Sequence, residues 1–415
     1  MSTVARASAH GADGVESAYA WTRLLTCLAA STIGGVGMWS GVVALPALQA
    51  EFGGGRAEAS LPYTALMIGI MAGGILWGRI ADRFGVAVTV AGGALAIGAG
   101  YALASVATSL WQFTLAQAVL IGGLGAAASF GPLIADVSHW FIRRRGIAVA
   151  IGSSGSYLAG TVWPPIVQHL IDGHGWRQTH LGIGLFCVVT MLPLALLLRR
   201  RPPVHDAVAA ETIARRAAAQ IDLSPRTVQA LLVLAGLACC VAMSMPQVHI
   251  VAYCVGLGYA PARGAEMLSV MLGCGILSRL ATGLVADRIG GLRTLLIGSG
   301  LQLLALMLYM PFDALVSLYL IAALFGLSQG GIVPSYALIV RDVFPPSEAG
   351  QRIGLVLAAT LAGMAVGGWM SGKIFDLTGS YQAAFANGIA WNLLNLGIAY
   401  LLFYRGGRSS RPAPA

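Results

Sequence analysis

One arginine of this sequence stands inside an otherwise apolar run. The stretch GCGILSRLATGLVADRIGG covers residues 273–291 and carries Arg279 in its middle, eight residues before Asp287. At 1.5 Å per helical residue, Arg279 lies roughly 12 Å from the helix end that Asp287 marks. A guanidinium binds a carboxylate through two parallel hydrogen bonds, which a lysine cannot do. Arg279 is therefore our first candidate for a functional residue, as a receptor for an organic anion.

Two other interpretations of Arg279 stay open if this helix lies in a bilayer. An arginine near the centre of a membrane helix costs about 2.5 to 3.5 kcal/mol on insertion scales. Backbone carbonyls and helix-end dipoles could hold the side chain as a structural element, or it could face lipid. We favour the receptor, because a depth of about 12 Å is too great for the side chain to reach the head groups comfortably in a core of about 30 Å.

The rest of the sequence shows no enzymatic chemistry. It has no Walker-type phosphate loop, no paired Cys or His at metal spacing and no nucleophile elbow. The six cysteines fall in or beside apolar stretches, so we expect reduced thiols that pack rather than disulfides. We therefore expect no enzyme, no cofactor and no metal site, and any transport must draw its energy from gradients or exchange.

The composition indicates a membrane protein. Hydrophobic residues make up 57% of the chain and charged residues 10%, against roughly 25% charged residues in soluble domains. A membrane helix needs about 20 apolar residues, and the sequence divides into twelve such stretches. They are predicted at 22–48, 61–81, 86–107, 110–135, 146–170, 178–198, 227–250, 263–286, 292–311, 314–340, 353–373 and 382–404.

The positions of the basic residues predict the orientation in the membrane. If the helices alternate in direction, one side receives Arg143, Arg144, Arg145, Arg199, Arg200, Arg201, Arg215, Arg216, Arg405, Arg408 and Arg411. The loops on the other side hold only Arg56, Arg177, Arg263 and Lys373. This positive-inside bias places both termini in the cytoplasm. It also accounts for the net charge of +9 without a nucleic-acid partner.

The sequence contains an internal duplication. Residues 78–85 read GRIADRFG and residues 283–290 read GLVADRIG, and subtracting 82 from 287 gives an offset of 205 between their aspartates. Subtracting 205 from 279 gives position 74, which is Gly74. The duplicated scaffold therefore does not require Arg279, and a charge present in one half alone favours a substrate site.

The duplication defines the predicted domains. They are a cytoplasmic tail over 1–21 without a cleaved signal peptide, a six-helix bundle over 22–198, a cytoplasmic linker over 199–226, a second six-helix bundle over 227–404 and a cytoplasmic tail over 405–415. Two bundles related by a parallel repeat suit alternating access, in which they rock about a site held near the membrane midplane.

The repeated Gly-x-x-Ala-Asp-Arg-x-Gly pattern resembles the cytoplasmic loop motif of the major facilitator superfamily, and the resemblance covers nearly the whole chain. It implies an all-α fold of about twelve transmembrane helices in two pseudo-symmetric bundles. The aspartates would accept hydrogen bonds from a helix N-terminus, and the arginines would anchor in lipid head groups. The residues expected to latch the inward gate are Gly78, Asp82, Arg83, Gly85, Gly283, Asp287, Arg288 and Gly290.

Two further stretches are similar to signatures of the monocarboxylate porters and their bacterial relatives, the oxalate:formate antiporter group. They are WFIRRRGIAVAIGSSG at 140–155 and MPQVHIVAYCVGLGY at 245–259, the second containing His249 and Tyr253. The resemblance implies an arginine at the position of Arg279. Relatives often carry an acid, thought to hold the coupled proton, where this chain has Gly256. His249 is then the preferred proton carrier, because histidine titrates near physiological pH; a histidine that caps the helix end is the alternative.

The resemblance also implies positions that line the pore. The oxalate branch carries a second cation on its eleventh helix, whereas residues 353–372 contain no basic residue before Lys373, so a single carboxylate is favoured over a dianion. Further cavity candidates are Trp39, Tyr157, Trp163, Gln329 and Tyr336. Ordinary packing or an interfacial aromatic belt is the alternative role for each of them.

These observations predict a secondary transporter of a small organic anion in a bacterial inner membrane, functional as a monomer. A lactate-like or pyruvate-like monocarboxylate, moved with a proton or by exchange, is the preferred substrate. A larger carboxylate or lactone from aromatic breakdown is the second possibility, since the aromatic candidates could accommodate a ring. A membrane sensor that does not transport is a third, although the sequence keeps both gate motifs and no soluble signalling domain is evident.

Overall fold

The computed structural model describes residues 16–141, 144–200 and 223–409 of the chain. Helices form almost all of this described part, which contains no β-strand. This agrees with the predicted all-α fold. It also follows from the composition, because in hydrocarbon every backbone N–H and C=O group must be satisfied within its own segment or by a neighbour. Most of the predicted linker, and the ends of both predicted tails, lie outside the described residues.

The chain divides into two compact units. Unit 1 holds the described residues of Met1–Phe52 and Ala65–Asp206, and unit 2 holds those of Gly53–Thr64 and Ala207–Ala415. One segment departs from the predicted bundles, since residues 53–64 precede most of unit 1 in sequence but belong to unit 2. Helix α4 therefore begins in one unit and continues in the other.

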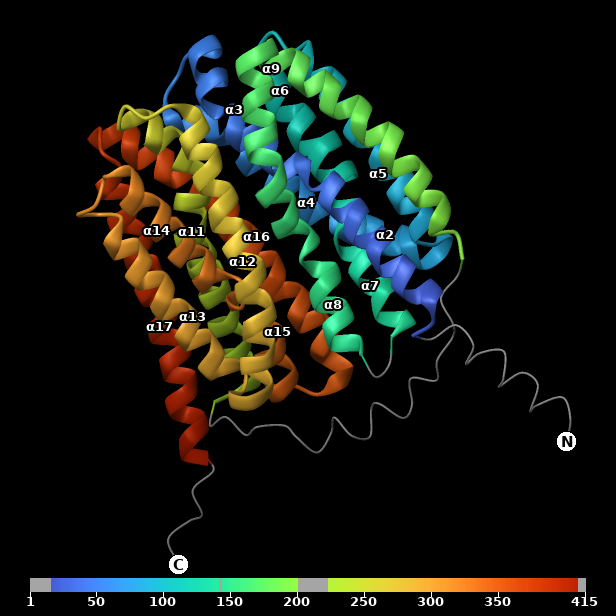
Figure 1. Ribbon diagram of the computed structural model, residues 1–415. Coiled ribbons are helices and arrows are strands. Elements are labelled where there is room, and N and C mark those ends of the chain that lie inside the picture. Colours follow the sequence, from blue (N-terminus) through green and yellow to red (C-terminus); the bar gives the residue numbers. More distant parts are fainter. Residues whose placement is uncertain (1–15, 142–143, 201–222, 410–415) are drawn as a thin grey trace, which may run out of the picture. The chain divides into compact units, whose positions relative to one another are not determined.

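Figure 1 shows the helices of both units, labelled in the order in which they occur in the sequence. Unit 1 contains α2 (Ala18–Gly34), α3 (Val36–Phe52), most of α4 (Arg56–Phe84), α5 (Val86–Ser105), α6 (Leu110–Leu115), η1 (Ala116–Gly125), η2 (Ala126–Ser129), α7 (Gly131–Trp140), α8 (Arg145–Ser153) and α9 (Gly155–Leu197). Unit 2 contains α11 (Pro225–Gly256), α12 (Pro261–Ile289), α13 (Gly291–Leu308), α14 (Leu315–Gln329), α15 (Ile332–Val343), α16 (Pro346–Thr378) and α17 (Tyr381–Ser409).

Each of the twelve predicted spans falls mainly on one or two of these helices, although some run past a helix end, as 86–107 does at Ser105 and 292–311 does at Leu308. In the described residues, 11 helical stretches are long and apolar enough to cross a membrane, and one of them, Gly146–Leu197, is 52 residues long. That stretch contains Gly175 at φ 76°, where the chain leaves the helical path and turns back (Figure 1). It therefore holds the two spans predicted at 146–170 and 178–198. Helix α17 continues to Ser409, past the predicted end of the last span at residue 404.

The duplication is visible in the backbone as well as in the sequence. Gly85 and Gly290 follow the two Asp-Arg motifs and both have positive φ angles, 88° and 84°. Gly175 and Gly379 also have positive φ angles, 76° and 70°, but they are 204 residues apart (379 minus 175) and differ in ψ, at 159° and 8°. Only glycine adopts such angles without strain. The two units therefore share the turn that follows each Asp-Arg motif.

Each unit also breaks one helix at the same place. In unit 1 the span from Leu110 is π-helical over Ala116–Gly125 and then forms a short 3₁₀ turn before α7. In unit 2, α14 ends at Gln329 and α15 begins at Ile332. Subtracting 125 from 330 gives 205, so Gly125 and Gly330 are offset partners at the two breaks. Such departures from α-helical geometry frequently mark functional positions.

Glycines let the broken helix of unit 2 approach α12 closely. A Cβ atom on Gly326 would lie 2.9 Å from Cys274 Cβ and would overlap the Met271 carbonyl group. A Cβ atom on Gly330 would lie 2.6 Å from the Arg279 backbone nitrogen. The two glycines are four residues apart and form the small-residue contact typical of membrane helix pairs.

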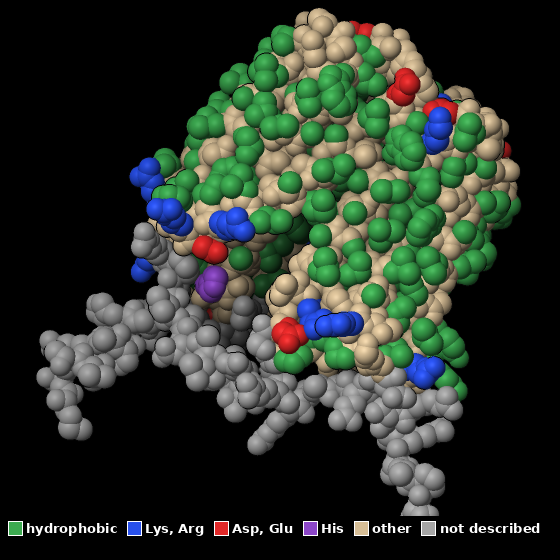
Figure 2. Space-filling model, turned by 180° about the vertical axis from the view of Figure 1, so that it is seen from behind, with side chains coloured by type: hydrophobic (Ala, Val, Ile, Leu, Met, Phe, Trp, Pro, Cys, Tyr) green, Lys and Arg blue, Asp and Glu red, His purple; other side chains and the backbone are tan. Residues whose placement is uncertain are grey.

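The surface is that of a membrane protein. On the face drawn in Figure 2, hydrophobic side chains are spread over most of the surface, and charged side chains lie mainly towards its margins. Large apolar side chains are widely exposed, among them Leu185 at 66%, Leu284 at 69% and Val316 at 72%. Exposure of this extent is expected where lipid tails are the solvent.

We predict that Gly326→Ala destabilises the protein by about 1 to 3 kcal/mol, because the added methyl group overpacks the contact with α12. Gly300→Ala on α13 is the matched control, since a Cβ atom there meets no atom within 4 Å. The measurement is thermal unfolding of the purified protein in detergent. A Gly326→Ala protein that unfolds at the same temperature as Gly300→Ala would contradict the close packing.

Candidate functional site

Arg279 lies where α12 crosses the break between α14 and α15. Its side chain is half-buried, and its Nε atom donates a hydrogen bond to the Gly330 carbonyl oxygen at 3.4 Å. Gly330 directly follows α14, so its carbonyl belongs to a helix end, where backbone acceptors lack partners within the helix. A guanidinium has five N–H donors. A carbonyl at a helix end is the kind of partner that the structural interpretation of Arg279 expects, and the role of Arg279 as a carboxylate receptor stays a prediction.

Two glutamines and a serine place further polar groups near this break. Gln329 is the last residue of α14 and is fully buried, and its Oε1 atom accepts a hydrogen bond from Gln247 Nε2 on α11. Gln329 Nε2 and Ser278 Oγ are buried without a hydrogen-bond partner in the described part of the chain. Since buried polar atoms normally have partners, the residues that precede Gly330 and Arg279 in the sequence hold unused hydrogen-bonding capacity.

Sequence reasoning had selected Gln329 but missed Gln247 and Ser278. Gln247 lies within the long apolar helix α11, and Ser278 immediately precedes Arg279. A signal was available, because polar side chains inside an apolar span tend to contact other helices rather than lipid. The break that brings Gln329 and Gly330 against α12 lies at the polar and small residues of the run SQGG at 328–331, which the prediction of one continuous span at 314–340 did not use.

His249 and Tyr253 lie in a buried aromatic cluster towards the end of α11. His249 Nε2 is 2.8 Å from the Gly368 carbonyl oxygen, and Nδ1 is 3.3 Å from the Tyr381 hydroxyl. Tyr253 packs edge-on against Tyr381 and Phe385, with ring centroids 5.5 and 5.4 Å apart. With a carbonyl at one nitrogen and a hydroxyl at the other, the geometry suits a neutral imidazole. These contacts favour packing for both side chains, and the proton-carrier role of His249 stays a prediction.

Tyr336 belongs to a polar network inside unit 2. It is fully buried and its hydroxyl donates to Asn395 Oδ1 at 2.7 Å, while Asn395 Nδ2 donates to Ser299 Oγ at 2.8 Å. This chain of bonds connects α15, α17 and α13. The described contacts of Tyr336 are therefore those of a residue that ties helices together.

The aromatic candidates of unit 1 lie where α9 meets α2 and α3. Trp163 Nε1 donates to the Thr32 carbonyl oxygen at 2.9 Å, and Trp39 Nε1 donates to the Ser156 carbonyl oxygen at 3.4 Å. Both indole rings are buried, whereas Tyr157 is half-buried. Trp39, Tyr157 and Trp163 are thus grouped within unit 1, and a pore-lining role for them stays a prediction.

The gate-motif residues occupy equivalent helix ends. Asp82 and Arg83 are exposed at the end of α4, as are Asp287 and Arg288 at the end of α12. Gly85 and Gly290 follow them with positive φ, and a Cβ atom on Gly78 or Gly283 would meet open space. Exposed positions at the helix ends are compatible with the predicted latch, which these contacts do not test.

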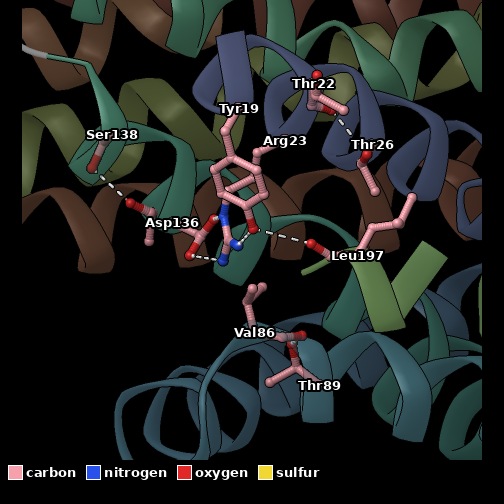
Figure 3. Close-up of polar contacts among 10 residues, drawn as sticks. Tyr19, Thr22, Arg23, Thr26, Val86, Thr89, Asp136, Ser138 and Leu197 are labelled. Carbon is pink, nitrogen blue, oxygen red and sulfur yellow. Dashed lines mark hydrogen bonds and ion pairs between the residues drawn. The ribbon is translucent and has the colours of Figure 1, made fainter. Parts of the chain in front are cut away.

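The structure adds a buried ion pair that the sequence did not predict (Figure 3). Arg23 of α2 donates from Nε and Nη2 to the two Asp136 oxygens of α7, at 2.6 and 2.8 Å. Its Nη1 donates to the Tyr19 hydroxyl at 3.0 Å, and that hydroxyl donates to the Leu197 carbonyl oxygen of α9 at 3.1 Å. The guanidinium also lies 4.9 Å from the centroid of the Trp140 ring. One arginine therefore joins α2, α7 and α9.

We predict that Asp136→Leu alone destabilises the protein by about 3 to 5 kcal/mol, because it leaves the Arg23 guanidinium buried without its carboxylate. Arg23→Met combined with Asp136→Leu is expected to recover most of that loss, since no buried charge then remains. Thermal unfolding in detergent measures both. If the single and the double variants unfold at the same temperature, an unpaired Arg23 guanidinium is not the cause of the destabilisation, and the prediction is wrong.

Comparisons with known proteins place these features in a family. The family model described as Major Facilitator Superfamily matches residues 27–326 and 280–415. The chain is 28% identical to monocarboxylate transporter 13 of Bos taurus over 332 residues, covering 78% of this chain and 75% of that protein. It is 28% identical to the MFS transporter asaE of Aspergillus flavus over 301 residues, covering 70% of this chain and 65% of that protein.

Solved structures show the same fold. An inward-facing, occupied bacterial homologue of the human lysosomal transporter Spinster matches with a TM-score of 0.69 at 14% identity, covering 96% of this chain and all of that one. The nucleoside transporter NupG matches with a TM-score of 0.70 at 14% identity, covering 92% and 99%. The family model and the repeated Asp-Arg motifs agree. The chain is a multi-pass membrane transporter of the major facilitator superfamily and not an enzyme.

Proposed function

We propose that this transporter carries a small organic anion, with a monocarboxylate such as lactate or pyruvate as the preferred substrate. The observation that carries the proposal is the placement of Arg279. Its guanidinium donates to a carbonyl at a helix break, and the residues that precede Arg279 and Gly330, Ser278 and Gln329, have buried polar atoms without a described hydrogen-bond partner. A charge that costs this much to place in an apolar helix is commonly retained for a functional reason.

The polar groups around Arg279 suit a carboxylate that bears a second oxygen. The guanidinium supplies a bidentate pair of donors for the carboxylate. The amide of Gln329 and the hydroxyl of Ser278 supply donors that could take a 2-oxo or 2-hydroxy oxygen. A single cation matches one carboxylate, in agreement with a monocarboxylate rather than a dianion. The similarity to monocarboxylate transporter 13 supports this substrate class.

A larger substrate is the second candidate. The chain is also similar to the protein named fujikurins efflux protein of Gibberella fujikuroi, at 28% identity over 330 residues. The aromatic side chains Trp39, Tyr157 and Trp163 of unit 1 could accommodate a ring if they line the transport path. A larger carboxylate or lactone would then use the same arginine.

The proposal also includes the orientation of the chain and the membrane in which it lies. The positive-inside bias supports cytoplasmic termini. Alternating access would use rocking of the two units, with proton symport or anion exchange as the energy source. A bacterial inner membrane and a functional monomer stay predictions, since the curated relatives named above come from fungi and a mammal.

We predict that purified protein in liposomes accumulates radiolabelled L-lactate or pyruvate when the outside solution is more acidic than the lumen, so that the proton gradient is directed inward. Accumulation that requires a preloaded anion would indicate exchange instead. Benzoate uptake without lactate uptake would favour the larger substrate class. Binding of these anions without any flux, in vesicles of verified integrity, would contradict transport and indicate a sensor.

We predict that Arg279→Lys weakens lactate binding at least tenfold, because an ammonium group cannot reproduce the bidentate contact. Arg341→Lys, an exposed arginine at the end of α15, is the matched control and is expected to bind like the unmodified protein. Equilibrium binding of radiolabelled L-lactate in nanodiscs measures both. Unchanged binding by Arg279→Lys would overturn the receptor role.

A further inference from the structure

At one end of unit 1 a carboxylate, an arginine and an aromatic ring form a closed cluster. Glu51 lies near the end of α3, and its Oε2 atom accepts a hydrogen bond from Trp176 Nε1 at 2.6 Å. Its other carboxylate oxygen pairs with Arg177. The Arg177 guanidinium lies 4.2 Å from the centroid of the Trp176 ring and donates to the Ala107 carbonyl oxygen at 2.7 Å. In unit 1 the chain itself therefore supplies the anion of this cluster, the Glu51 carboxylate.

The offset of 205 residues maps this cluster onto unit 2. Trp176 corresponds to Tyr381, and Glu51 corresponds to Gly256. An arginine is present there too, although a different segment supplies it. The Arg56 guanidinium at the start of α4 lies 5.3 Å from the Tyr381 ring centroid and 4.7 Å from the Phe375 ring centroid. Unit 2 therefore has the aromatic surface and the cation but lacks the carboxylate.

The space for that carboxylate is open. Gly256 is exposed at the end of α11, and a Cβ atom built on it would have Arg56 Nη2 as its only neighbour within 4 Å, at 3.9 Å. Arg56 Nε is buried without an acceptor in the part of the chain that the structure describes. An anion above Gly256 would face the guanidinium directly, as Glu51 faces Arg177 in unit 1.

The nearest acid is already engaged elsewhere. The Asp376 carboxylate accepts hydrogen bonds from the backbone N–H groups of Arg56 and Ala57, at 2.7 and 2.9 Å, and so caps the N-terminus of α4. Within the described residues it forms no ion pair with the Arg56 guanidinium. Its charge and the carbonyl end of α11 oppose an anion, so binding here should be weak and readily reversible, as loading of a transported substrate requires.

The position is separate from Arg279. Helix α12 begins at Pro261, a short loop after Gly256, and Arg279 lies 18 residues further along. At 1.5 Å per residue this is roughly 27 Å along the helix.

We propose that unit 2 carries a second anion site, over Gly256 and against Arg56, in which the carboxylate of the transported organic acid takes the place that Glu51 fills in unit 1. The inference rests on the proposed function for the identity of its ligand. The carboxylate would accept from the Arg56 guanidinium, while the Tyr381 and Phe375 rings hold the guanidinium in place.

The test is equilibrium binding of radiolabelled L-lactate and of benzoate to the full chain in nanodiscs. Gly256→Glu supplies the missing carboxylate from the chain, so it should compete for Arg56 and remove one of two binding sites per chain. Arg56→Gln should weaken that same site at least tenfold. Val255→Glu is the matched control, because it adds the same charge on the neighbouring exposed residue and should leave both sites in place.

The variants separate this proposal from the proposed function. If Gly256→Glu retains both sites with unchanged affinity, the second site is wrong, whatever Arg279→Lys shows. If Gly256→Glu removes one site while Arg279→Lys retains both, the second site stands and the receptor role of Arg279 fails. Binding at a single site that Gly256→Glu does not alter, or no binding of either anion to the unmodified protein, overturns the second site.

Discussion

The structure of unit 2 depends on how a guanidinium is accommodated inside an apolar helix. Arg279 costs about 2.5 to 3.5 kcal/mol or more at this depth, and the surrounding helices provide what offsets it. The break between α14 and α15 presents the Gly330 carbonyl, and Gly330 itself allows that carbonyl to approach because a Cβ atom would lie 2.6 Å from the Arg279 backbone nitrogen. The break between α14 and α15, the close contact at Gly330 and the Arg279 side chain therefore depend on one another.

The two units show which features belong to the scaffold. Positive-φ glycines at Gly85 and Gly290, the Asp-Arg helix ends and the broken fourth helix of each unit recur at the same offset. Among the features that do not recur are Arg279, which corresponds to Gly74, and Glu51, which corresponds to Gly256. A duplicated fold can carry a charged residue in one unit and an uncharged residue at the equivalent position of the other. A ligand site is therefore best sought at such positions.

Much of this architecture could be predicted from hydropathy and spacing. The twelve spans, the duplication and the superfamily followed from apolar stretches and from a motif that occurs twice. The helix breaks were not predicted, because the runs GGLG at 122–125 and SQGG at 328–331 carry no charge that would end an apolar stretch. The Arg23–Asp136 pair was also not predicted. Asp136 directly follows the predicted span at 110–135, a position at which an aspartate is expected to be exposed to water. Partners distant in sequence become evident only when the helices are packed.

The central claim is that Arg279 receives the carboxylate of the transported anion. An experimental structure of the protein with bound L-lactate tests it most directly. If Arg279 is the receptor, its guanidinium donates two hydrogen bonds to the lactate carboxylate, and the hydroxyl-bearing carbon of lactate points towards Gln329 and Ser278. Lactate bound elsewhere in the described bundle, with Arg279 contacting only backbone carbonyls, would contradict it and show that the arginine is a structural element of the break.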